Sequence, residues 1–125
     1  MDNILKGSQD YVIYLIVRND LKMGKGKIAA QCGHAIQHLT IINLASNSSI
    51  FNKYLRFGGA KICLKVNSEK ELDNITGYCK QNNITHYQVV DAGRTQVEPN
   101  TKTVLGIGPI LKSDVPSIIS ELKLL

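Results

Sequence analysis

Residues 11–35 read YVIYLIVRNDLKMGKGKIAAQCGHA, and the change of pattern within them decides the fold. Residues 11–17 form a continuous apolar run rich in β-branched and aromatic side chains, as is typical of a central strand covered on both faces. From Gly26 onward the apolar residues recur with a helical period and form one stripe. This stripe contains Ile28, Cys32, Ala35, Ile36, Leu39 and Ile42. The sequence therefore predicts a buried strand that leads directly into an amphipathic helix.

The next part of the chain continues this alternation of helix and strand. Ser49 is predicted to cap a short second helix, which the sequence RFGG at 56–59 ends. Residues 60–66, AKICLKV, alternate between apolar and polar positions and are interpreted as a second strand. Ser68 and Glu71 match a capping box, which predicts a third helix that ends at QNN.

The C-terminal part adds two strands and a helix. Residues 85–90 are predicted to form the third strand, and residues 101–109 the fourth, with a polar loop between them. The last helix is predicted to start at Ser113 or Asp114, with Pro116 in its first turn.

The predicted order of elements is β-α-α-β-α-β-β-α, which indicates an α/β fold with helices on both faces of a sheet. Helical crossovers separate the first three strands, so these three are predicted to be parallel. Only a loop joins the third strand to the fourth, so the fourth is predicted to be antiparallel and the sheet mixed. We expect a single domain over residues 11–125, preceded by a short polar tail at residues 1–10.

The composition favours a polyanionic partner. Fifteen Lys and Arg residues against ten Asp and Glu residues, in a chain of 125, give a net charge of +5. Nucleic acid is the first expected partner and an acidic membrane surface the second, while simple solubility is an alternative explanation. Cys32, Cys63 and Cys79 form no C-x-x-C motif and are expected to be reduced and mostly buried. Because no apolar run is long enough to cross a bilayer, we expect a cytoplasmic protein without a membrane partner.

Polar residues far apart in the sequence are expected to meet at one edge of this sheet. Ligands of open α/β sheets gather beyond the carboxyl ends of the parallel strands. Residues 22–27 follow the first strand, and Asp91 follows the third. If the fourth strand runs back, Lys102 and Thr103 begin it at the same edge.

The segment KMGKGK at residues 22–27 stands where a helix is predicted to begin. A helix N-terminus carries unpaired N–H groups and a partial positive charge. Gly24 and Gly26 let a ligand approach the backbone closely. Three lysines add full charges: Lys22, Lys25 and Lys27. These features favour a phosphate site, with a lysine-rich surface turn as the alternative, and the absence of a Walker pattern argues against a nucleoside triphosphatase.

The same helix is predicted to have a polar face opposite its apolar stripe. This face contains Lys27, Gln31, His34 and His38. The two histidines have the i, i+4 spacing of a metal-ligand pair, but no third ligand stands near them in the sequence, so no metal site is predicted. One histidine is expected to orient a substrate or a water. A solvated surface position is the alternative, and it is the interpretation preferred for His38.

Residues 89–103, VVDAGRTQVEPNTKT, hold a second concentration of polar side chains. They include a carboxylate, hydroxyls and cations: Asp91, Thr95, Thr103, Arg94 and Lys102. A carboxylate that accepts a proton from water, beside donors that stabilise an oxyanion, suits hydrolysis by an activated water. A turn-forming role for Asp91, or a salt bridge to Lys27, is the alternative. No Ser-His-Asp arrangement or G-x-S-x-G elbow is visible, which disfavours a covalent serine route.

Several motifs together closely resemble the type 2 peptidyl-tRNA hydrolases. They are RNDLKMGKGKIAAQCGHA at 18–35, DAGRTQVEPNT at 91–101, TVLGIGP at 103–109 and ELKLL at 121–125. The resemblance implies an enzyme that cleaves the ester between a nascent peptide and the 3′-terminal ribose of tRNA, without a metal or an organic cofactor. It also implies a three-layer α/β/α sandwich on a four-stranded mixed sheet, and a homodimer, since dimers are common in that family.

The resemblance also implies roles for individual residues. Its catalytic set falls on Lys27, Asp91, Thr95, Thr103 and His34. The residues expected to contact the substrate are Asp20, Lys22, Gly24, Lys25, Gly26, Gln31, Arg94 and Lys102. The expected partner is peptidyl-tRNA, held at its acceptor stem and 3′ end mostly through the backbone. A non-catalytic RNA-binding module, or an interaction protein on the same fold, is the alternative.

Overall fold

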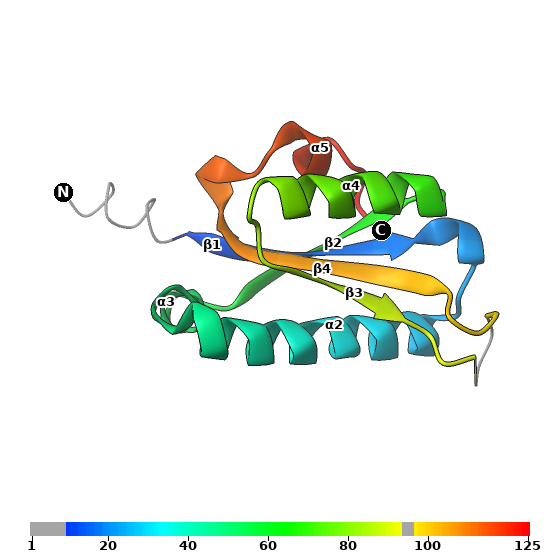
Figure 1. Cartoon of the computed structure of the whole chain (residues 1–125), viewed down its shortest axis with the longest axis horizontal. Coiled ribbons are helices and arrows are strands. Elements are labelled where there is room, and N and C mark those ends of the chain that lie inside the picture. Colours follow the sequence, from blue (N-terminus) through cyan, green and yellow to red (C-terminus); the bar gives the residue numbers. More distant parts are fainter. Residues whose placement is uncertain (1–9, 94–96) are drawn as a thin grey trace.

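The computed structural model describes residues 10–93 and 97–125 (Figure 1). Within these residues, four strands form one sheet in the order β2-β1-β4-β3. The strands are β1 (Tyr11–Arg18), β2 (Ala60–Val66), β3 (His86–Val90) and β4 (Lys102–Leu111). β1 pairs in parallel with β2, whereas β4 runs antiparallel to both β1 and β3. The predicted mixed sheet is confirmed, while the single domain stays a prediction and the predicted tail, apart from Asp10, lies outside the described residues.

β1 is the central strand that the apolar run predicts. Residues 12–17 are all buried, because β2 and β4 flank the strand and helices cover both faces. Alternate side chains enter two different cores. One core receives Val12, Tyr14 and Ile16, and the other receives Ile13, Leu15 and Val17. A continuous apolar run therefore supplies both faces of the sheet at once.

The strand pairing differs from the prediction in one respect. The sequence predicts three parallel strands, but the sheet has one parallel pair, β1 with β2. β4 lies between β1 and β3, so β3 has an antiparallel neighbour although it points in the same direction as β1. Burial explains this order: residues 103–108 of β4 are covered, whereas β3 is mostly half-buried, as suits an edge strand. The carboxyl ends of β1 and β3 and the start of β4 therefore share one edge.

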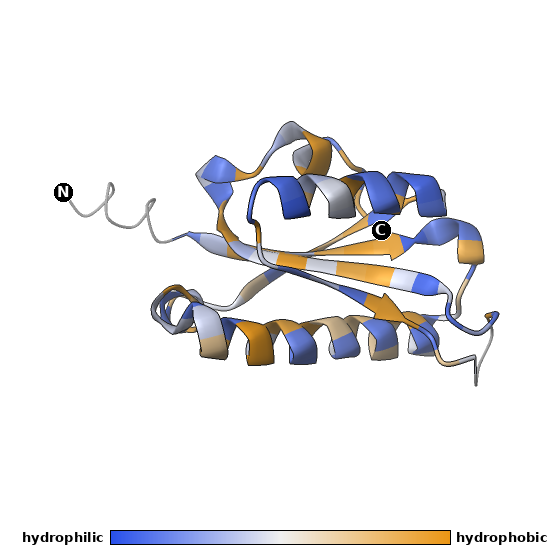
Figure 2. Ribbon diagram, in the orientation of Figure 1, coloured by the Kyte–Doolittle hydropathy of each residue, from blue (hydrophilic) through white to orange (hydrophobic). Residues whose placement is uncertain are grey.

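Helices lie on both faces of the sheet, which confirms the α/β class (Figure 1). The helices are α2 (Lys25–Ser46), α3 (Ser48–Arg56), α4 (Glu69–Gln81) and α5 (Ser117–Ser120), with 3₁₀ turns η1 (Asn19–Leu21) and η2 (Lys112–Asp114). α2 and α3 pack on one core, and α4 and α5 on the other. Figure 2 shows the apolar strands between these two helical layers. In the described part of the chain, no helix has the length and apolar character needed to cross a membrane.

The helix starts are only partly as predicted. The capping motif is present at α4, where the Ser68 hydroxyl accepts a hydrogen bond from the Glu71 N–H at 3.1 Å. The Glu71 carboxylate in turn accepts from the N–H of Asn67 at 3.4 Å. α3, however, begins at Ser48 with Asn47 as its N-cap. Ser49 therefore lies inside the helix and does not cap it.

The last predicted helix is shorter than expected. Instead of one helix from Ser113 or Asp114, the chain forms η2 and then the four-residue α5. Pro116 is the N-cap of α5 and not part of its first turn. A proline disfavours helical backbone at the residue before it, and Val115 is accordingly extended, with ψ of 127°. The proline thus separates two short segments.

Two sets of contacts fix α2 on the sheet. Gly106 of β4 has no side chain, and a Cβ there would lie 2.8 Å from Leu39 Cδ1 and 3.1 Å from Ala35 Cβ. Asn43, which is fully buried, donates from Nδ2 to the carbonyls of Leu39 (2.8 Å) and Gly108 (3.1 Å). α2 therefore packs closely on β4, and its N-terminus lies at the edge where β1 and β3 end.

Candidate active site

Lys27 and Asp91 form a buried ion pair at this edge of the sheet. Lys27 Nζ donates to Asp91 Oδ1 at 2.7 Å, and each side chain is only 8% exposed. Lys27 comes from the first turn of α2, and Asp91 directly follows β3. The expectation that these distant groups meet is confirmed. The salt bridge that stood as the alternative interpretation of Asp91 is therefore also present.

The loop after β3 fixes the backbone of Asp91. Its N–H donates to the carbonyl of Thr101 at 2.9 Å, and its carbonyl accepts from the N–H of Asn100 at 2.7 Å. Gly93 has a φ of 82°, and a Cβ there would lie 2.6 Å from Pro99 Cγ, so this turn requires glycine. The closed base of the loop holds the Asp91 carboxylate toward α2.

The start of α2 carries positive charge and no acidic side chain. Gly24 is the N-cap and has no side chain to bond the first N–H groups, and the first turn contains no acidic residue. Lys22 and Lys25 are exposed beside it. α4 gives a contrast, because Ser68 caps it and its first turn carries two glutamates. An anion at the start of α2 would meet both the helix dipole and full positive charges.

Arg18 also belongs to this edge, although the sequence motifs do not single it out. Its guanidinium donates to both carboxylate oxygens of Asp20, at 2.6 Å from Nη2 and 3.2 Å from Nε. It also donates to the carbonyl of Lys102 at 3.3 Å. The hydrogen bonds from Arg18 lower the pKa of Asp20 below its ordinary value. The signal in the sequence is an arginine at the end of a buried apolar run, with an aspartate two residues later.

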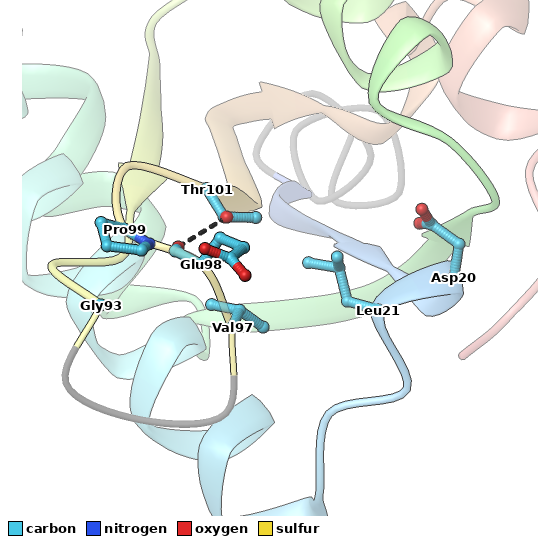
Figure 3. Close-up of a pocket in the computed structure, with 7 residues that line it drawn as sticks. All are labelled: Asp20, Leu21, Gly93, Val97, Glu98, Pro99 and Thr101. Carbon is cyan, nitrogen blue, oxygen red and sulfur yellow. Dashed lines mark hydrogen bonds between the residues drawn. The ribbon is translucent and has the colours of Figure 1, made fainter.

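A cleft of about 590 Å³ lies between η1 and the loop that follows β3 (Figure 3). Its lining residues are Asp20, Leu21, Gly93, Val97, Glu98, Pro99 and Thr101. Thr101 Oγ1 donates to the carbonyl of Glu98 at 2.6 Å, as the dashed line in Figure 3 marks. The side chains of Leu21 and Glu98 point into the space between the two walls. The volume is in the range of sites that bind small organic groups.

Two buried side chains near this edge each have a polar atom without a hydrogen-bond partner among the described residues. They are Gln31, whose Nε2 is unpaired, and Thr103, whose Oγ1 is unpaired, at 2% and 0% exposure. The predicted position of Gln31 on the polar face, opposite the apolar stripe, is wrong. It occupies the buried face of α2 with Ala35 and Leu39, one helical turn after Lys27. Buried polar groups without a partner are uncommon, so both side chains could bond a ligand.

The two histidines of α2 differ in their surroundings. His34 is exposed. His38 is half-buried and stacks on Tyr87 of β3, with ring centroids 4.1 Å apart, so its interpretation as a solvated histidine is wrong. Among residues 10–93 and 97–125, no three His, Cys, Asp or Glu side chains are grouped so that they could hold a metal ion.

One predicted site residue points away from the Lys27–Asp91 pair, and two others cannot be placed. Lys102 Nζ donates to Asp73 Oδ1 of α4 at 2.9 Å, which directs this side chain to the other helical layer. Arg94 and Thr95 lie outside the described residues, so their roles stay predictions.

The cysteines have the character of packing residues. All three are free, with Cys79 buried and the other two half-buried. Burial raises the pKa of Cys32 to about 12, with a smaller contribution from Cys63, and raises that of Cys79 to about 11. Thiols held protonated in this way are poor nucleophiles.

Comparisons with known proteins identify the family of this chain. The family model described as "Peptidyl-tRNA hydrolase PTH2" matches residues 11–125. A Drosophila melanogaster protein, "Probable peptidyl-tRNA hydrolase 2", is 41% identical over 118 residues, which cover 94% of this chain and 63% of the relative. "Peptidyl-tRNA hydrolase" of Saccharolobus solfataricus is 44% identical over 115 residues, covering 89% of this chain and 96% of the relative. "Peptidyl-tRNA hydrolase 2, mitochondrial" of Homo sapiens is 38% identical over 98% of this chain and 68% of its own length.

Proposed function

Because the chain belongs to the PTH2 family of peptidyl-tRNA hydrolases, we propose that it cleaves the ester between a peptide and the 3′-terminal ribose of tRNA. The observation that carries the proposal is the buried Lys27–Asp91 pair, 2.7 Å long, in the first turn of α2 and at the end of β3. At one site, a carboxylate can activate water, while an ammonium group and a helix N-terminus can stabilise the oxyanion formed during hydrolysis of an ester or bind nearby phosphates.

Asp91 orients the attacking water and accepts its proton. The water oxygen bonds to the carbonyl carbon, the ester C–O bond breaks, and the 3′ oxygen of the ribose leaves with the proton that Asp91 took from the water. Lys27 stabilises the oxyanion or an adjacent phosphate; an ammonium group has three N–H donors, so donation to Asp91 leaves two for substrate. The reaction needs no metal in this scheme.

Four further side chains support this centre. Gln31 and Thr103 are buried with polar atoms that lack partners among the described residues, so they are suited to hold the ester or the water. Thr95 and His34 are assigned with them from the family resemblance, His34 as an auxiliary group.

The exposed lysines before and within the first turn of α2 bind phosphates of the acceptor stem. Lys22 and Lys25 supply charge, and Gly24 and Gly26 admit the RNA backbone to the helix N-terminus. Arg94 is assigned to phosphate binding from the family resemblance alone, whereas Lys102 is engaged with Asp73 and is left out of this scheme. The cleft bordered by Asp20 receives the 3′-terminal nucleoside. Contacts of this kind go to the backbone and carry little sequence information, so broad acceptance of tRNAs follows.

A homodimer in the cytoplasm completes the proposal. Leu124 and Leu125 are 70% and 45% exposed, and a second copy would cover them. Three free cysteines suit a reducing compartment. Light scattering after size-exclusion chromatography measures the mass of the particle, and cell fractionation measures the location. A monomeric mass, or recovery of the protein in an organelle, would overturn the corresponding part.

The test of activity uses the purified protein with N-acetyl-aminoacyl-tRNA in the presence of a chelator. We expect release of the N-acetyl-amino acid, with the chelator having no effect. Binding of tRNA that weakens with salt, without any release, would support the non-catalytic alternative instead. Release that stops on chelation would contradict the metal-free mechanism.

A further inference from the structure

The positive charge of the chain is concentrated in one stretch of sequence. Residues 21–68 contain seven Lys and Arg residues and no Asp or Glu, whereas the rest of the chain contains eight basic and ten acidic residues. The stretch therefore accounts for more than the whole net charge of +5. In the fold it forms α2, α3 and β2, so the charge asymmetry becomes an asymmetry between the two sides of the sheet.

Three of these basic residues lie far from the Lys27–Asp91 pair. Lys53 and Arg56 are exposed in the last turn of α3, and Lys61 is exposed at the start of β2. Lys61 Nζ lies 5.7 Å from the centre of the Tyr54 ring and donates to the carbonyl of Gly59 at 2.8 Å. We call these three side chains, Lys53, Arg56 and Lys61, the distal basic cluster. None of them takes part in an ion pair within the described residues.

The layer on the other side of the sheet has a different charge pattern. The first turn of α4 carries Glu69 and Glu71, and Asp73 of the same helix pairs with Lys102. On such a surface the acidic groups repel a polyanion and so weaken its attraction to the basic groups. The α2 and α3 side offers positive charge without that opposition.

The distal basic cluster and the start of α2 mark two ends of one layer. α2 has 22 residues and spans about 33 Å at 1.5 Å per residue, and α3 follows its C-terminus. Figure 1 shows α3 at the opposite end of the molecule from the edge that holds the start of α2. The rise of ~3.4 Å in B-form DNA gives about ten base pairs over this length, and the more compact A-form duplex of RNA needs a few more. Cations separated in this way suit a long, stiff polyanion.

We propose that the distal basic cluster binds phosphates in the base-paired part of tRNA, about 30 Å from the ester that is cleaved. The inference rests on the proposed function, because the reacting 3′ end fixes the other end of the substrate at Lys27 and Asp91. Continuity of this layer with the reaction centre favours the substrate's own backbone over an acidic membrane as the occupant. The cluster contributes affinity for full-length tRNA and takes no part in the chemistry.

The test compares two double variants on two substrates. Lys53→Gln/Arg56→Gln removes two charges from α3, and Lys70→Gln/Lys80→Gln removes two exposed charges from α4 as the matched control. One substrate is N-acetyl-aminoacyl-tRNA, and the other is the same acyl group on the trinucleotide CCA, which has no duplex.

For the α3 variant we expect kcat/KM on the full-length substrate to fall about tenfold, with kcat unchanged and the salt slope reduced by about 1 to 2. The short substrate and the α4 variant should stay within about twofold of the unchanged protein. An equal loss in the α4 variant, an equal loss on the short substrate, or no loss at all would overturn the proposal.

Two further measurements distinguish this proposal from a failure of the proposed function and from membrane binding. If neither substrate is cleaved, the proposed function fails, and tRNA binding measured by fluorescence anisotropy still decides on the cluster by the same comparison of variants. Co-sedimentation with anionic phosphatidylserine vesicles, lost in the α3 variant while its kcat/KM on tRNA is unchanged, would assign the cluster to a membrane and overturn the inference.

Discussion

Two lysine–aspartate pairs of nearly equal length lie at the same edge of the sheet, one on each side of it. Lys27 Nζ and Asp91 Oδ1 are 2.7 Å apart toward α2, and Lys102 Nζ and Asp73 Oδ1 are 2.9 Å apart toward α4. Their side chains are 8% and 8% exposed in the first pair, but 35% and 45% exposed in the second. The two contacts have similar lengths but differ in exposure to water. We expect this difference in exposure to separate a functional pair from a surface pair.

The buried pair is poorly explained by stability alone. Removing two charges from water costs several kcal/mol per ion, and their attraction often only offsets this cost. The exposed pair loses little hydration, and pairs of this kind contribute a net of about 0–1 kcal/mol to stability. We therefore interpret the buried pair, which lies next to a cleft, as a pair of charges held in place for a ligand, in line with the proposed reaction centre.

The largest expected effect is on catalysis by the buried pair. Lys27→Ala should lower kcat by ~10²-fold or more, because it removes the cation that stabilises the developing oxyanion. Asp73→Ala in the exposed pair should leave kcat within about twofold. Steady-state release of the N-acetyl-amino acid from tRNA measures both. Equal losses in the two variants would remove the distinction between the pairs.

The second effect is the coupling within each pair, measured by a double-mutant cycle. Replacing Lys27 and Asp91 by alanine, singly and together, should give a coupling free energy of about 1.5 kcal/mol or more from urea unfolding, because water screens this pair poorly. The same cycle on Lys102 and Asp73 should give about 0.2–1 kcal/mol. Coupling of the same size in both cycles would show that burial does not separate them.

The third prediction sharpens the comparison with an intermediate pair, Arg18 and Asp20, whose side chains are 11% and 31% exposed. The hydrogen bond from Arg18 lowers the pKa of Asp20 in the folded protein. The pair therefore stabilises the fold above the ordinary pKa of an aspartate, and this contribution is lost as the pH falls through the lowered value. Asp20→Asn should be less stable than the unchanged protein at neutral pH and equal to it in strong acid. Urea unfolding over a pH series would contradict this if the difference persisted in acid.

The smallest effect belongs to the exposed pair. Hydrogen bonding to Asp73 raises the pKa of Lys102, so its contribution is present at neutral pH and is lost as the pH rises through the raised value. Asp73→Asn should change the free energy of unfolding by less than about 1 kcal/mol at neutral pH, and by less again in high salt. Urea unfolding at low and high ionic strength measures this. A large change that resists salt would show that this pair is also protected from solvent.

The sequence predicts secondary structure correctly where a short local pattern determines it. The apolar run of β1, the start of α2 within one residue, and the capping of α4 by Ser68 all depend on neighbours in the chain. The meeting of Lys27 and Asp91 is also predicted, because β1 and β3 point the same way whichever strand lies between them.

The incorrect or missed predictions concern features that depend on contacts between distant parts of the chain. The position of β4 between β1 and β3 depends on which strand is buried more fully, and no local pattern reports that. Gln31 is polar, yet it takes a core position on α2, because packing on the sheet fixes which face is buried. His38 is covered by Tyr87, which comes from a different strand. The contacts of Arg18 likewise join three elements that the sequence does not place together.

The rate constant for acyl release in a single turnover, with enzyme in excess over N-acetyl-aminoacyl-tRNA, tests the role of the buried pair most directly. Asp91→Asn and Asp73→Asn make the same isosteric change on the two sides of the sheet. The account predicts a fall of ~10²-fold or more for Asp91→Asn and a change within about twofold for Asp73→Asn. A rate constant near that of the unchanged protein for a folded Asp91→Asn variant would contradict it.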